Sequence, residues 1–137
     1  MITVLREDYG LRLTFVEPVT HEQAAEWLEE MERAVNGFPD GFSVFVDLRG
    51  MELFSSDNKA IVEQVQSICL THGFKRSVVI LGKELTEMQL KLIASASGIR
   101  QMERYIVASK CESWEEAGLN WVRHAIEPDV SALPPAS

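Results

Sequence analysis

Short continuous apolar runs alternate along this chain with longer stretches whose apolar residues recur at helical spacing. The continuous runs are rich in β-branched residues, which predicts five strands. These runs are Ile2 to Arg6, Leu11 to Phe15, Phe42 to Leu48, Ser77 to Leu81 and Tyr105 to Ala108. The turn residues Asp8-Tyr9-Gly10 separate the first two runs, so the chain opens with a predicted hairpin.

Four stretches carry apolar residues at steps of three and four, which predicts amphipathic helices. They are His21 to Asn36, the Ser55-Ser56 pair to His72, Thr86 to Gly98, and Ser113 to residue 126. Thr20 with Gln23, and Ser113 with Glu116, have the spacing of capping boxes at two of the helix starts.

The predicted order is ββαβαβαβα, which indicates an α/β domain. Strand–helix–strand units of this length imply parallel strand pairs, and the hairpin adds an antiparallel edge. We therefore expect a mixed, mostly parallel sheet with about four helices packed on it. Residues 1–126 form one predicted domain, and residues 127–137, EPDVSALPPAS, form a predicted flexible C-terminal tail because they have no apolar period.

Composition and charge narrow the classes of partner. The chain has 137 residues, 46% of them hydrophobic, and a formal net charge of -8. Binding to phosphate backbones depends on clustered Lys and Arg, so we expect no nucleic-acid partner. No stretch approaches the about 18 apolar residues of a membrane span, so no membrane insertion is expected. Two cysteines without C-x-x-C spacing fit a cytoplasmic location.

Three segments together resemble the STAS domains, the family of anti-sigma-factor antagonists, and among them the SpoIIAA-like bacterial proteins. The segment VDLRGMELFSSDNKAIV resembles the STAS signature, in which a strand ending in Asp-Leu leads through a short loop to Asp-Ser-Ser-Gly and a helix. LRLTFVEPVTHEQAAEWLEEMERAV resembles the second strand and first helix of the family. SGIRQMERYIVASKCESWEEAGLNWV resembles its last strand and helix.

The resemblance implies a regulatory module that binds a protein and catalyses nothing. In the regulated antagonists, a partner kinase phosphorylates the second serine of Asp-Ser-Ser-Gly. A gapless match from Val46-Asp47-Leu48 aligns that motif with residues 55–58, so the acceptor position falls on Asp57. A loop that differs by one residue would return Ser56 to this position. Asp57 would instead place a permanent negative charge at the helix start, where the helix dipole favours it.

The loop and helix start after Leu48 are the predicted working surface, because open α/β sheets place binding sites beyond the carboxyl ends of their strands. The predicted contact or phosphorylation residues are Arg49, Met51, Phe54, Ser55, Ser56, Asp57 and Asn58. Two structural alternatives stay open. One of the serines caps the second helix, and the apolar loop residues fold back onto the core.

No motif of an enzyme, a metal site or a cofactor site is present in the sequence. The chain lacks the Gly-rich nucleophile and phosphate-binding signatures. His21, His72 and His124 are not spaced as metal ligands. We therefore expect no catalytic residue, no metal and no cofactor.

The predicted function is binding of a protein partner, such as an anti-sigma-factor-like kinase or another regulator. The alternative is a carrier that holds a small molecule or lipid in an apolar pocket between sheet and helices. The sequence leaves a homodimer open and names no partner.

Overall fold

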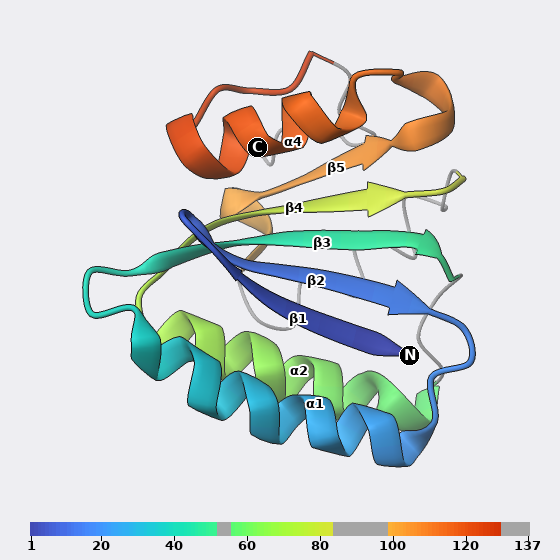
Figure 1. Cartoon of the computed structure of the whole chain (residues 1–137), viewed down its shortest axis with the longest axis vertical. Helices are drawn as coiled ribbons and strands as arrows, with labels where there is room; N and C mark the ends of the chain where they lie inside the picture. The colour runs from blue at the N-terminus through green and yellow to red at the C-terminus, as the bar shows by residue number, and fades with distance from the viewer. Residues whose placement is uncertain (52–55, 84–98, 130–137) are drawn as a thin grey trace.

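The computed structural model of the chain describes residues 1–51, 56–83 and 99–129, which fold into one sheet and its covering helices (Figure 1). The strands are β1 (Ile2–Glu7), β2 (Gly10–Val16), β3 (Phe42–Gly50), β4 (Phe74–Leu81) and β5 (Glu103–Val107). The α-helices within these residues are α1 (His21–Ala34), α2 (Ser56–Thr71) and α4 (Trp114–His124). Short 3-10 helices span Val35–Gly37, Ile99–Met102 and Ala108–Lys110.

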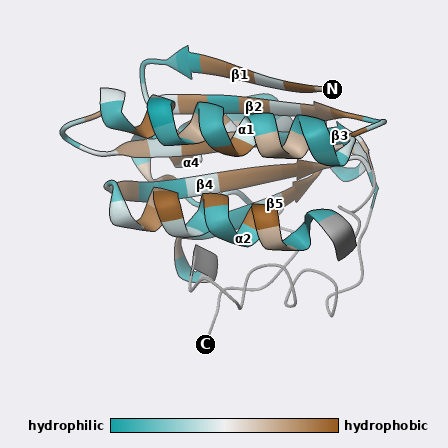
Figure 2. Ribbon diagram, turned by 90° about the horizontal axis from the view of Figure 1, so that it is seen from below, coloured by the Kyte–Doolittle hydropathy of each residue, from teal (hydrophilic) through white to brown (hydrophobic). Residues whose placement is uncertain are grey.

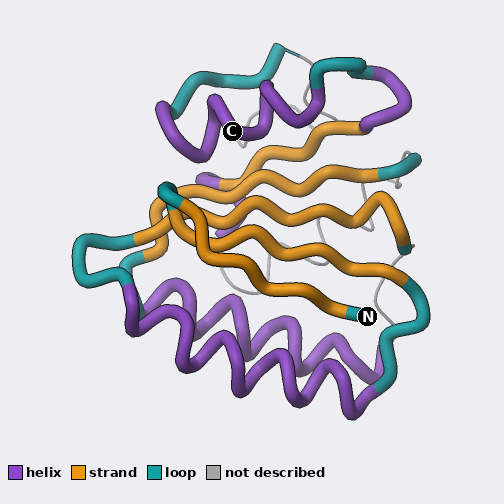
Figure 3. The backbone as a smooth tube through the Cα atoms, viewed as in Figure 1, coloured by secondary structure: helices purple, strands orange, loops and turns teal. Residues whose placement is uncertain are grey.

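The five strands form one mixed sheet in the order β1-β2-β3-β4-β5. β1 pairs with β2 in antiparallel fashion, and the other neighbouring strands are parallel. The α/β class and the opening hairpin, which Figure 3 shows, are therefore confirmed, and the strand pairings confirm the mostly parallel sheet. The helix predicted from Thr86 to Gly98 lies outside the described residues.

The hairpin turn depends on a glycine. Gly10 has a φ of 147°, a backbone conformation that other residues rarely adopt. A Cβ atom at this position would lie 2.1 Å from the main-chain oxygen of Ser43. Gly10 therefore lets β2 begin in close contact with β3.

Helix α1 begins with the predicted capping box. The Thr20 hydroxyl accepts a hydrogen bond from the Gln23 main-chain N–H at 3.1 Å, and the Gln23 side chain accepts one from the Thr20 N–H at 3.0 Å. These two bonds satisfy N–H groups that the helix itself leaves without partners. The α-helix ends at Ala34, and the 3-10 helix Val35–Gly37 takes up the last predicted turn.

The capping box predicted at Ser113 is wrong. Ser113 occupies the N-cap position of α4, but its side chain makes no capping hydrogen bond. Its backbone, with ψ at 32°, departs from the extended conformation that normally aims an N-cap side chain at the first turn. The Ser113 hydroxyl lies instead 3.8 Å from the Cys111 sulfur.

Helices cover both faces of the sheet (Figure 2). We call the side that carries α1 and α2 the helix-pair face, and the opposite side the α4 face. The helix-pair core includes Phe15, Trp27, Met31 and Phe42. The α4 core consists of Phe45, Val78, Ile80, Ile106, Trp121 and Val122. Its helix is anchored where the Trp121 indole N–H donates to the Ser77 main-chain oxygen at 2.8 Å.

The end of α4 leads into the predicted tail. Ala125 adopts the left-handed conformation and closes the helix. The carboxylate of Glu127, the first residue of the predicted tail, pairs with the Arg104 guanidinium of β5. Residues 130–137 lie outside the described residues.

Candidate functional site

The carboxyl end of β3 brings a charged pair to the α4 face. Side chains alternate along a strand, so Phe45, Asp47 and Arg49 share one face. Phe45 packs in the α4 core, which fixes this face as the α4 side. Asp47 is buried at 5% exposure, whereas the Arg49 side chain is 45% exposed.

Arg49 supplies three hydrogen bonds to the Asp47 carboxylate. Its main-chain N–H and its Nε both donate to Oδ1 at 3.0 Å, and its Nη2 donates to Oδ2 at 2.9 Å. Burial alone would raise the pKa of Asp47, but these bonds and the positive charges of Arg49 and Arg12 lower it. Asp47 in turn raises the pKa of Arg49. A carboxylate held in this way stays ionised and is poorly suited to proton transfer.

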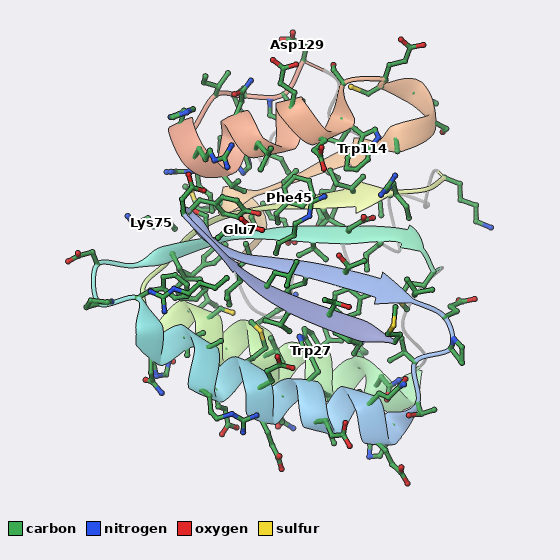
Figure 4. All side chains as sticks on the ribbon, viewed as in Figure 1. Glu7, Trp27, Phe45, Lys75, Trp114 and Asp129 are labelled. Carbon is green, nitrogen blue, oxygen red and sulfur yellow. The ribbon has the colours of Figure 1, made fainter. Side chains whose placement is uncertain are left out.

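Helix α4 completes the site with an aromatic surface. The Arg49 guanidinium carbon lies 3.9 Å from the centre of the Trp114 ring, within the range of a cation–π contact. The Trp114 and Phe45 rings are 6.4 Å apart. Figure 4 shows Trp114 and Phe45 on the α4 side of the sheet, with Trp27 on the helix-pair side.

A second arginine, Arg12 of β2, contacts the same group of side chains. The Arg12 guanidinium carbon lies 4.5 Å from the centre of the Phe45 ring, and its Nη2 lies 2.7 Å from Oε2 of Glu115. We name the group the arginine–aromatic cluster and define it as Arg12, Phe45, Asp47, Arg49, Trp114 and Glu115. Two carboxylates balance its two arginines, and fixed contacts on several sides preorganise it.

The arginine–aromatic cluster borders an exposed part of the sheet. Helix α4 packs over β3, β4 and β5. No element among the described residues covers the same face of β1 and β2. Leu5 of β1 and Val16 of β2 are 49% and 37% exposed there. The cluster therefore lies at the boundary between a covered and an uncovered part of the α4 face.

The described residues place part of the site predicted from the sequence. Arg49 joins the arginine–aromatic cluster. Met51 is half-buried and packs against the helix-pair core. This position favours the alternative in which the apolar loop residue folds back onto the core. Asn58 is 4% exposed, so its side chain is buried and does not form part of the molecular surface. Phe54 and Ser55 lie outside the described residues. Helix α2 begins at Ser56, so Ser56 and Asp57 are its first two residues.

Sequence reasoning missed Arg12, Trp114 and Glu115. Arg12 and Glu115 are 103 positions apart, and only the fold brings them together. A weak signal existed for Arg12, because it is a polar residue between Leu11 and Leu13 on a predicted strand. Such an alternating position faces away from the core that its neighbours enter.

Two other titratable groups lie on the helix-pair side. Removal from water raises the pKa of Glu103 to about 7, although the Tyr105 hydroxyl donates to its carboxylate at 3.0 Å. Burial likewise raises the pKa of the Cys69 thiol to about 12. No group of three or more His, Cys, Asp or Glu side chains within the described residues could hold a metal ion.

The comparisons with known proteins bear on the fold alone. No family model matches the chain, and no curated protein is detectably similar to it. Among solved structures, the chain is similar to the NMR structure of the protein TM1081, with a TM-score of 0.53 and 16% sequence identity. The match covers 90% of each chain.

Within the described part, no helix is both long and apolar enough to cross a membrane. The alternative function, a carrier that holds a small molecule or lipid in an apolar pocket, stays a prediction.

Proposed function

We propose that this protein is a non-catalytic, STAS-like regulatory module that binds a protein partner in the cytoplasm through the carboxyl end of β3. The observation that carries the proposal is the fixed position of Arg49 between Asp47 and Trp114. Arginine and tryptophan are enriched among the residues that dominate binding energy at protein interfaces. Here an exposed guanidinium is already ordered, which lowers the entropic cost of binding.

The electrostatics of the cluster favour recognition over catalysis. Its buried carboxylate has a lowered pKa, and both of its oxygens accept hydrogen bonds from Arg49, so it lacks the properties of a general acid or base. Arg12 is paired with Glu115, which leaves the cluster without the excess positive charge expected of a phosphate-binding site. A partner would therefore meet a neutralised surface that offers directional contacts.

The start of α2 is the proposed regulatory position, because it follows directly from the loop after β3. A phosphate on Ser55 or Ser56 would add about -1.5 to -2 charges near a helix N-terminus. The class of partner that fits is an anti-sigma-factor-like kinase or another regulator. Intact-mass spectrometry of protein purified from its own host tests the modification, and an unmodified mass would remove the phosphorylation part of the proposal.

Site-specific photo-cross-linking tests the contact surface. A photoreactive residue at position 113, an exposed position next to Trp114 that leaves Arg49 in place, is expected to form a discrete cross-linked product with a partner in host lysate. The same residue at position 33, an exposed arginine in the last turn of α1, is the control. Trp114→Ala should reduce the product formed from position 113. Equal products from both positions, or no effect of Trp114→Ala in a folded variant, would remove this surface from the proposal.

A further inference from the structure

Strand β1 is an edge strand whose outer side has no described partner. It is last in the sheet order and pairs with β2 alone. In Figure 2 it lies beyond α1, at the margin of the layer of helices. The opposite edge strand, β5, is shorter, and its Arg104 is tied to Glu127 from the segment after α4. An exposed edge of this kind can pair with another strand.

The hydrogen bonds to β2 show which main-chain groups of β1 face outward. The Met1 amino group donates to the Val16 oxygen, and the Val16 N–H donates to the Met1 oxygen. Because antiparallel pairs alternate, Thr3, Leu5 and Glu7 also direct their main-chain groups toward β2. Ile2, Val4 and Arg6 therefore direct their N–H and C=O groups away from the sheet.

The usual protection against edge pairing is weak on β1. The strand has no proline, no glycine and no interruption of its register with β2. The Arg6 guanidinium is held back toward the helix-pair side, where Nη2 donates to the Gly37 oxygen at 2.9 Å and the group lies 4.6 Å from the centre of the Phe38 ring. Leu5 is 49% exposed on the α4 face. Charged side chains, bulges and prolines are what normally block such an edge.

We infer that β1 is a homodimerisation edge, on which a second copy of this chain pairs its own β1 in antiparallel fashion across a two-fold axis. One register uses every outward main-chain group. This register places Val4 opposite Val4 of the second copy, and Ile2 of each copy opposite Arg6 of the other. The two sheets then form one continuous sheet. Other antiparallel registers leave some of these groups unpaired.

Side chains support a second copy as the occupant. In this register Leu5 lies beside Thr3 of the second copy on the α4 face, so the exposed leucine can pack against the methyl group of that threonine. Arg6 faces Ile2, so no like charges are directly opposed.

The strand surface is small compared with the roughly 1,600 Å² of a standard interface, so the dimer is weak and reversible. Each copy carries a charge of -8, so added salt should strengthen the dimer by screening the repulsion.

Sedimentation equilibrium over a concentration series tests the dimer. The wild type should move from one chain mass to two, and Val4→Pro should weaken dimerisation by roughly tenfold or more, because each copy loses one outward main-chain donor. Proline is tolerated on an edge strand where the N–H faces solvent. Leu5→Lys, at an exposed position, should also weaken dimerisation. It replaces Val4→Pro as the test if the proline variant fails to fold. Val16→Lys is the control for added charge on the same face.

Amide hydrogen exchange supplies an independent measurement. In the dimer, the amides of Ile2, Val4 and Arg6 should become protected as the concentration rises, while those of Thr3 and Leu5 are protected in both states. A wild type that stays monomeric at every concentration and salt level overturns the inference. So does a dimer that neither β1 variant weakens, because it must use another surface. The residues tested differ from Arg49 and Trp114, so this result and the cross-linking result stand or fall separately.

Discussion

The two faces of the sheet are held to their helices by different chemistry. On the helix-pair face, α1 and α2 close over a continuous apolar core that contains Phe15, Trp27 and Met31. On the α4 face, a single described helix covers only part of the sheet, and arginines, aromatic rings and carboxylates meet at its boundary. The difference indicates that the first face mainly provides stability, while the second can place polar groups in fixed positions near solvent.

Two carboxyl groups illustrate the same contrast. Asp47 on the α4 face has an arginine partner, and its pKa is lowered. Glu103 on the helix-pair face is taken out of water, and its pKa is raised to about 7. Asp47 therefore contributes stability above its unfolded pKa, and this contribution is lost as the pH falls through the lower folded value. Glu103 has the opposite dependence.

The largest expected effect comes from opening the helix-pair core. Phe15 is 1% exposed, and its ring lies 5.1 Å from the centre of the Trp27 ring in an edge arrangement. Phe15→Ala should lower the free energy of unfolding by about 3 to 5 kcal/mol, measured by urea denaturation. Leu70→Ala, at a 41% exposed position of α2, is the control, with an expected change within about 0.5 kcal/mol. Similar losses in the two variants would contradict the assignment of the core.

The next effect comes from breaking the charged pair on the α4 face. Arg49→Ala removes the two side-chain hydrogen bonds to the buried Asp47 carboxylate and keeps only the main-chain one, so it should cost about 2 to 3 kcal/mol of unfolding free energy. Asp47→Ala combined with Arg49→Ala should cost less than the sum of the two single changes, because the partners interact directly. Additive losses in this double-mutant cycle, read by the same denaturation, would mean that the pair is not coupled.

A smaller effect should appear in the pH dependence of stability. Between the unfolded pKa of about 4.5 and the folded value of about 7, the folded state binds the Glu103 proton more tightly than the unfolded state does. Glu103 therefore makes the protein less stable as the pH rises through this window. Glu103→Gln should remove this dependence and be more stable than the wild type by about 1 to 2 kcal/mol above about pH 8. Parallel pH profiles of the two proteins would refute the raised pKa.

The smallest effect compares two helix starts. Thr20→Ala should cost about 1 kcal/mol, because it removes a capping hydrogen bond that α1 makes on the helix-pair side. Ser113→Ala at the start of α4 is the matched control and should be nearly neutral, because Ser113 makes no capping bond. Thermal unfolding of both variants measures the difference. A larger loss at Ser113 would reverse the distinction between the two caps.

The sequence was a good guide to local structure. Apolar runs located the five strands of the described residues, and helical spacing located α1, α2 and α4, because these patterns reflect which side of each element is buried. The boundaries moved by a few residues, as at β4, which begins at Phe74 instead of Ser77. The predicted capping box at Ser113 is absent. A serine has the hydroxyl needed to cap a helix, but the backbone angles decide whether the capping hydrogen bond forms.

The amino-acid sequence by itself determined the order of strands and helices, the opening hairpin, the capping box at Thr20 and the position of Arg49 after a buried strand. Only the tertiary structure decided that Arg12, Arg49 and Trp114 meet, and that β1 presents the main-chain groups of Ile2, Val4 and Arg6 outward. Periodicity is a property of neighbouring residues and is visible in the chain. A contact between β2, β3 and α4, by contrast, depends on how the sheet stacks its strands and on which face each helix packs.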